Sequence, residues 1–324
     1  MLWLLFFSFA FALGYPTLNR YDPRTVGNDQ NAYYEMVTHA KVPGYAPFAY
    51  RLLVPYVAKP FYWLARGRSG TWEPVWFGML VANSIFCSTF SILQLSMGFR
   101  ILRNLPQALL GCTVALLSYA VPDLWLSGYI DASEACLLMA VTLCMFTGKW
   151  WPLPLIGIVG GFAKQTFLPF ATVFALVWWI YSGKSKRTYG QLACIVGMAL
   201  TSFASIVFAF RFVEGRYMMP WSMASHWWNY GTLGSNLINT FTDHRLIYPL
   251  VWLLPLGFWR LHRFPRSWVM ATIVTGLFVF GFAGFTQIGA SVNRPMFNVI
   301  APLFALSTAC FISGAGDQSQ KSTS

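Results

Sequence analysis

Long apolar runs separated by short polar segments dominate the hydrophobic pattern of this chain. Each run is bounded by charges, proline or glycine, and about 20 apolar residues are enough to cross a bilayer core. The pattern therefore predicts an all-α protein, a polytopic transmembrane helical bundle of about ten membrane helices, some of them short or broken. The runs begin near residues 1, 74, 105, 131, 152, 165, 189, 247, 268 and 295.

The run over residues 152–181 carries internal breakers. It contains Gly157, Gly160, Gly161 and Lys164, and it is too long for one ordinary span yet short for two. We therefore expect two short helices that meet near Lys164. That places a lysine at the tip of a hairpin.

Residues 50–65 also depart from a simple span. Arg51, Pro55, Lys59 and Pro60 make a full crossing costly, because charges and missing amide donors are poorly tolerated in lipid. This segment is predicted to be a re-entrant or interfacial helix lying on the bundle.

Composition agrees with a membrane protein. The 324 residues are 56% hydrophobic and only 10% charged, with a mean hydropathy of +0.53, whereas soluble domains carry about 25% charged residues. Soluble, disordered and disulfide-scaffold proteins are excluded. Residues 1–15 lack a basic n-region, so we interpret them as a retained first helix and not as a signal peptide. All six cysteines lie in apolar stretches and are predicted to be core residues.

Basic residues in the short loops predict the topology. They share one side if residues 50–65 do not cross, and that side is expected to be the cytoplasm. Both termini are then cytoplasmic, and residues 1–313 form a single transmembrane domain with a polar cytoplasmic tail over 314–324. Residues 16–73, with interfacial helices, and 211–246 form two outer loops. The basic residues are Arg100, Arg103, Lys149, Lys184, Lys186, Arg187, Arg260, Arg263 and Arg266.

Net charge is +12, but these positions account for much of it, so no nucleic-acid partner is expected. Every acidic residue except Asp317 falls on or near the outer face in this topology. The acids contribute little to orientation, so a functional outer face is one explanation. Retained polar loops are the alternative.

The first outer loop holds the densest set of candidate groups. Asp29 and Asp22 are candidate catalytic carboxylates, and Glu35 follows in the same polar stretch. Asn28 or Asp29 could instead cap a helix that runs toward His39, because a short acceptor side chain satisfies an orphan amide. Both interpretations of Asp29 stay open at this point.

A second acidic group lies at Asp131 and Glu134. Their spacing of three puts them on one helix face. Negative charge at a helix N-terminus is favoured by the dipole, which is the structural explanation. Ionisable groups inside an apolar span are costly, which favours function for Asp131.

Three cations stand at the outer ends of predicted helices: Arg51, Lys164 and Arg294. A lipid-linked phosphate at headgroup level needs such partners, although snorkelling toward headgroups is the alternative. The chain contains no Ser-His-Asp order, zinc motif, Walker loop or Gly-x-Gly-x-x-Gly, which argues against nucleotide-dependent chemistry.

Four short motifs together resemble the GT-C glycosyltransferases of bacterial membranes. They are an Asp-x-x-x-Tyr in the first outer loop (Asp29 to Tyr33), an aromatic-x-Tyr-Arg-Leu-Leu-Val-Pro, a Gly-x-x-Lys-Gln-Thr hairpin (Gly161 to Thr166) and an Arg-Pro before the last span (Arg294, Pro295). The resemblance covers most of the chain. It implies a GT-C-like fold.

The resemblance also implies an activity. A sugar would move from a polyprenyl-phosphate donor to a glycan, lipid or protein acceptor on the extracytoplasmic side, with inversion, and an acidic first-loop residue would be the general base. Asp29 matches that acid best and Asp22 is the runner-up. Substrate-binding residues are then expected to be Arg51, Tyr33, Asp131, Lys164, Gln165 and Arg294.

No cofactor is expected, and a divalent metal is not indicated. The alternative function is a non-catalytic transporter of lipid-linked glycans or a membrane assembly factor, which would use the same charges without breaking bonds. A transporter should show charges along a path across the bilayer. Here the acids crowd at one face, which favours an enzyme.

Overall fold

A computed structural model describes residues 1–19, 28–39, 41–43, 47–68, 70, 72–183, 185, 187–220, 233–242, 251–285 and 293–314. Over these residues the secondary structure is helical and includes no β-strand. The tail over residues 315–324 and the candidate Asp22 lie outside them. The α-helices are α1 (Leu2–Leu18), α2 (Asn28–Thr38), α3 (Leu53–Ala65), α4 (Pro74–Leu102), α5 (Leu105–Leu116), α6 (Asp131–Phe146), α7 (Leu153–Ala163), α8 (Phe167–Tyr181), α9 (Tyr189–Glu214), α11 (Leu233–Thr242), α13 (Leu253–Phe258), α14 (Arg266–Phe285) and α15 (Asn293–Ile312). Three short elements join them: η2 (Phe48–Tyr50), the π-helical η3 (Val121–Trp125) and η5 (Leu261–Arg263).

Three of these helices are long and apolar enough to cross a membrane: α4, α9 and the Arg294–Ile312 part of α15. Several others are apolar but shorter, among them α1, α5, α7 and α8. The all-helical fold is therefore confirmed for the described residues. A membrane position for the shorter helices belongs to the proposal below.

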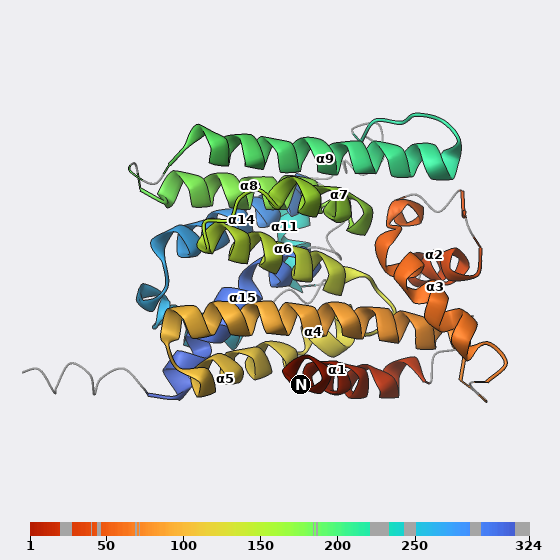
Figure 1. Ribbon diagram of the computed structural model, residues 1–324, viewed down its shortest axis with the longest axis horizontal. Helices are drawn as coiled ribbons and strands as arrows, with labels where there is room; N and C mark the ends of the chain where they lie inside the picture. The colour runs from red at the N-terminus through yellow and green to blue at the C-terminus, as the bar shows by residue number, and fades with distance from the viewer. Residues whose placement is uncertain are drawn as a thin grey trace, which may run out of the picture.

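The break predicted near Lys164 is confirmed. Helix α7 ends at Ala163, Lys164 is extended at φ −165° and ψ 140°, and α8 starts at Phe167. Glycine explains how closely α7 lies on α9, since a Cβ at Gly157 or Gly161 would collide with backbone oxygens of α9. Both short helices consequently lie beside α9, as Figure 1 shows.

Residues 50–65 do not form a spanning helix. Within them α3 has 13 residues, contains Pro60, and packs against the first part of α4. The approach is close, because a Cβ on Gly78 would stand 2.7 Å from the carbonyl oxygen of Ala58. The first predicted outer loop thus holds helices α2 and α3, and the second holds α11.

Different elements and contacts lie at the two ends of the bundle. Helices α2 and α3 gather at the right-hand end in Figure 1, where α4 begins and α9 ends. At the opposite end Arg266 lies over the ring of Tyr181, at 5.7 Å, and Gln107 donates to the Ser313 hydroxyl at 2.8 Å. These contacts join the start of α14 to the end of α8, and the start of α5 to the end of α15.

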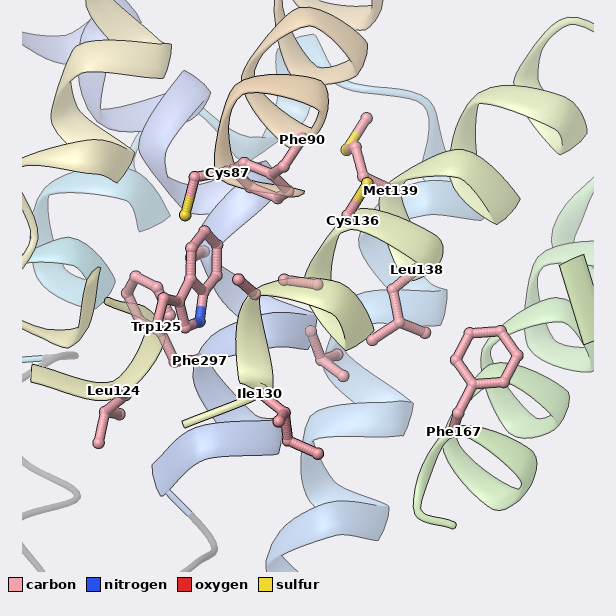
Figure 2. Close-up of a cluster of buried hydrophobic side chains, with 14 of the residues drawn as sticks. Cys87, Phe90, Leu124, Trp125, Ile130, Cys136, Leu138, Met139, Phe167 and Phe297 are labelled. Carbon is pink, nitrogen blue, oxygen red and sulfur yellow. The ribbon is translucent and has the colours of Figure 1, made fainter. Parts of the chain in front are cut away.

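An aromatic core supports the region between these ends. The Trp125 ring lies 4.9 Å from Phe90 and 5.6 Å from Phe297, centroid to centroid, in edge-on arrangements that favour aromatic pairs. Figure 2 shows Trp125 beside Phe297, with Ile130 at the start of α6. All four side chains are buried. This packing fixes α4, η3 and α15 against one another, next to the start of α6.

Candidate functional site

Six charged side chains meet where α2, α3, α6, α7, α8 and α15 come together. We call them the charged cluster; it contains equal numbers of carboxylates and cations. Its members are Asp29, Asp131, Glu134, Arg51, Lys164 and Arg294.

Lys164 holds the deepest part of the cluster together. Its Nζ lies 2.5 Å from Asp131 Oδ1 and 3.3 Å from Glu134 Oε2, and all three residues are buried. The broken hairpin makes this possible, because Lys164 is extended between α7 and α8 and its side chain reaches α6. A buried ammonium group needs such partners, since an unpaired charge in the interior is very costly.

Neutral side chains complete the coordination of Glu134. The Thr166 hydroxyl donates to its Oε1 at 2.6 Å, and the Asn298 amide donates to its Oε2 at 2.9 Å. Asn298 in turn accepts the indole proton of Trp125 at 2.9 Å. Each oxygen of this carboxylate is therefore bonded, which fixes the position of the Glu134 side chain.

Arg294 links the buried Asp131 to Asp29 of α2. Its NH1 lies 2.9 Å from Asp29 Oδ2 and 3.7 Å from Asp131 Oδ2. The guanidinium also stacks over the ring of Tyr129, at 3.8 Å from the centroid. One arginine thus bridges a carboxylate of α2 and a carboxylate of α6.

Arg51 differs from the other two cations because its partners are neutral. It donates from NH1 to the Tyr33 hydroxyl at 2.9 Å and from Nε to Gln165 Oε1 at 3.1 Å, and it lies over the Phe48 ring. No carboxylate of the described residues forms an ion pair with it. Arg51 is also buried, with an exposed fraction of only 8%. A nearly buried guanidinium without a carboxylate is suited to receive an anion.

Tyr33 and Gln165 hold this arginine in place. Gln165 donates from its amide to the Pro47 carbonyl at 3.2 Å, so its oxygen stays directed at Arg51. Burial raises the pKa of Tyr33, although the neighbouring Arg51 acts in the opposite direction. The phenol therefore remains protonated at neutral pH and can donate a hydrogen bond.

Asp29 is the most accessible carboxylate of the cluster. Its side chain is 13% exposed, whereas those of Asp131 and Glu134 are 1% and 0% exposed. Helix α2 begins one residue earlier, so Asp29 lies in the first turn, and its Oδ1 accepts the amide of Gln30 at 3.2 Å. The Gln30 side chain donates to the Ser127 carbonyl at 2.7 Å, which anchors this turn.

The start of α6 lies well along α4 from the first residue of that helix. Asn83 donates to the carbonyl of Tyr129 at 2.7 Å, and Asn83 is nine residues after Pro74. At 1.5 Å per residue, this contact is about 14 Å along α4 from its first residue. Asp131 and Glu134, in the first turn of α6, are therefore recessed from that end of α4. Figure 1 shows α2 and α3 at the same end of the bundle.

The structure brings together seven of the eight candidates predicted from the sequence, and the eighth, Asp22, lies outside the described residues. Sequence reasoning missed the neutral partners of the cluster, Asn298, Thr166, Tyr129 and Gln30. Asn298 had a signal, since an amide on an apolar helix is unusual, but nothing in its spacing named Glu134 as its partner.

Chemically, the arrangement offers one partly exposed carboxylate, Asp29, paired with Arg294, and a second arginine, Arg51, bonded to Tyr33 one helical turn along α2. Lys164 with its two carboxylates is buried behind them. Such a site can accept a proton and hold an anion. Within the described ranges, no group of three His, Cys, Asp or Glu residues is placed to hold a metal ion.

Comparison with known proteins identified no related protein. No protein-family model matches the chain, and neither a curated protein nor a solved structure matches it significantly. The geometry of the charged cluster therefore carries the functional argument.

Proposed function

We propose that the chain is a multi-pass protein of a bacterial inner membrane, with the charged cluster on the extracytoplasmic side and both termini in the cytoplasm. Three helices of sufficient length support this. Exposed aromatics flank α9, with Tyr189 at its start and Tyr217 just past its end, as is typical of membrane interfaces. Basic Arg100, Arg103 and Arg266 lie at the end of the bundle opposite the cluster.

Cysteine labelling tests this topology. We expect an impermeant maleimide added to intact cells to label Arg68→Cys and to spare Ser185→Cys, since these exposed positions lie at opposite ends of the bundle. Lysed cells should label both, and the wild type supplies the background from its six native cysteines. Labelling of Ser185→Cys alone in intact cells would reverse the orientation.

We further propose that the protein is an inverting glycosyltransferase with a polyprenyl-phosphate-linked sugar as donor. Asp29 would accept the proton of an acceptor hydroxyl as that oxygen attacks the anomeric carbon. The bond from the anomeric carbon to the phosphate oxygen would break, and its electron pair would leave with the polyprenyl phosphate. One observation carries the proposal: the accessible carboxylate Asp29 lies one helical turn from Tyr33, which holds Arg51, an arginine that pairs with no carboxylate of the described residues.

The structure separates the three candidate cations by their partners. Lys164 binds two carboxylates and is buried, and Arg294 binds Asp29. Arg51 has only neutral partners among the described residues, so its charge is the one left to pair with a leaving phosphate. Tyr33, protonated and bonded to Arg51, can donate a second hydrogen bond to the same phosphate. We therefore assign Arg51 and Tyr33 to binding of the donor phosphate. Lys164, with Asp131 and Glu134, would support the site from below.

Replacing Arg51 tests this assignment. We expect Arg51→Gln to lower kcat/KM for the lipid-linked donor by about 10- to 100-fold, because a hydrogen bond to a charged group contributes about 1.5–3 kcal/mol. The measurement is transfer of isotope-labelled sugar from a panel of polyprenyl-phosphate donors in vesicles. Arg216→Gln, an exposed arginine near the end of α9, is the matched control and should be unchanged.

Two outcomes would contradict the proposal. Unchanged transfer by Arg51→Gln would remove Arg51 from the donor site. Absence of transfer by the wild type with every donor, together with Arg51-dependent binding of polyprenyl phosphate, would favour the transporter or assembly function instead.

A further inference from the structure

Helix α3 is too short to cross a bilayer. Its 13 residues measure about 20 Å, against a hydrocarbon core of about 30 Å. It lies on the outer end of α4, in contact through Ala58 and Gly78. The depth of α3 in a membrane is therefore set by α4.

The length of α4 fixes that depth. Its 29 residues measure about 44 Å, so a helix along the membrane normal extends about 7 Å beyond a 30 Å core at each end. Gly78 lies four residues, or about 6 Å, from the start of α4. The middle of α3 is consequently at the boundary between acyl chains and headgroups.

The last turn of α3 and the residues after it expose a set of side chains suited to that boundary. Trp63 is 65% exposed and Leu64 is 62% exposed, and exposed Arg66 and Arg68 follow directly. We call these four residues the α3 patch. Tryptophan and leucine favour the acyl boundary, while arginine places its charge among headgroups.

The two arginines of the α3 patch have no carboxylate partner within the part of the chain that the structure describes. Neither forms an ion pair with a described residue, and the next acid along the chain, Glu73, accepts the Tyr34 hydroxyl at 3.2 Å. Their positive charge therefore faces outward beside an exposed tryptophan. An anion at headgroup level complements this charge, and a guanidinium pairs with phosphate in a bidentate manner.

We propose that the α3 patch binds the phosphate groups of anionic lipids in the outer leaflet, with Trp63 and Leu64 inserted at the acyl boundary. This surface is separate from the charged cluster. It rests on the membrane embedding proposed above and not on glycosyl transfer. Bound lipid would hold α3, and the Arg51 just before it, at a constant height above the cluster.

Lipid-specific quenching of Trp63 tests the proposal. The protein is reconstituted in vesicles that contain brominated phosphatidylglycerol or brominated phosphatidylcholine, and the Trp63 contribution is the difference between wild type and Trp63→Phe. We expect phosphatidylglycerol to be preferred. The preference should fall by about fivefold for each arginine removed, and by about 25-fold in Arg66→Gln/Arg68→Gln, because one basic residue near an anionic surface contributes about 1 kcal/mol.

A matched charge loss at the other end of the bundle is the control. Arg100→Gln/Lys149→Gln removes two exposed cations there and should leave the Trp63 preference unchanged. If the preference for phosphatidylglycerol fell equally in this control, the net charge of the protein would explain the preference, and the α3 patch would not be a lipid site. Displacement by millimolar inorganic phosphate would assign the arginines to a soluble anion instead.

A spin label separates failure of this inference from failure of the membrane proposal. We expect a nitroxide at Leu64→Cys to report the headgroup boundary, and one at Leu200→Cys, near the middle of α9, to report the hydrocarbon core. A Leu64 label in water with a deep Leu200 label would overturn the α3 patch alone. Two labels in water would overturn the membrane embedding, and with it both proposals.

Discussion

Asp29→Asn should lower glycan transfer by about 10²- to 10⁴-fold, the usual cost of removing a general base, while the protein still folds and inserts. The amide keeps one oxygen that can still accept the Gln30 amide in the first turn of α2, while the bond from Arg294 to the second carboxylate oxygen is lost. The proton acceptor disappears with the carboxylate. The measurement is kcat for transfer in vesicles, with thermal unfolding of the same preparation.

The same helix supplies a matched control. Glu35 is a more exposed carboxylate of α2, paired with His39 at 3.0 Å and remote from the ion pairs of the cluster. We expect Glu35→Gln to retain full transfer. A loss in Glu35→Gln as large as that in Asp29→Asn would indicate a general effect of α2 charge and would contradict the base assignment.

Asp22 remains the competing base. If Asp29→Asn transferred sugar at nearly the wild-type rate and Asp22→Asn did not, the base would be Asp22. If both variants transferred normally, the first-loop mechanism would be wrong.

The break at Lys164 shows what the sequence could predict. Glycines and a lysine inside one apolar run predicted two short helices, and α7 and α8 confirm it. The partner of Lys164 could not be predicted, because a local pattern does not report which helix lies opposite. Its ammonium group binds Asp131 and Glu134 directly, and it reaches the first-loop Asp29 only through Asp131 and Arg294.

Arg51 shows a second limit. Its position before a proline-containing helix predicted a cation at the outer end of that helix. Its placement follows from packing against Tyr33, which is 18 residues away in the sequence, and Gln165, which is 114 residues away. Whether a cation has a carboxylate partner depends on such packing. The sequence could therefore nominate Arg51, Lys164 and Arg294 together but could not rank them.

Helix α5 is shorter than the membrane helix that the apolar pattern predicted. An apolar run begins near residue 105, but the helix ends at Leu116 and the chain continues through η3 to Tyr129. Backbone that leaves a helix in the interior of a bundle must be bonded by other protein groups. Asn83 bonds the Tyr129 carbonyl and Gln30 bonds the Ser127 carbonyl, contacts from distant segments that hydropathy does not reveal.

Lys164→Met should destabilise the fold by about 3–5 kcal/mol, because it leaves two fully buried carboxylates without their shared cation. Arg294 still lies 3.7 Å from Asp131, but Glu134 keeps only the neutral Thr166 and Asn298. Denaturant unfolding in detergent measures the change. Lys149→Met, the same substitution at an exposed lysine, should change stability by less than about 0.5 kcal/mol.

A second variant makes this prediction specific to the ion pair. Adding Glu134→Gln to Lys164→Met removes the stranded carboxylate, so the double variant should be more stable than Lys164→Met alone, although each single change destabilises the wild type. This sign reversal follows from charge pairing and not from packing, because glutamine and glutamate have nearly the same volume. If the effects of the two changes simply added, Lys164 would not neutralise Glu134. The ion pair between Lys164 and Glu134 would then not be what supports the site around Asp29 and Arg51.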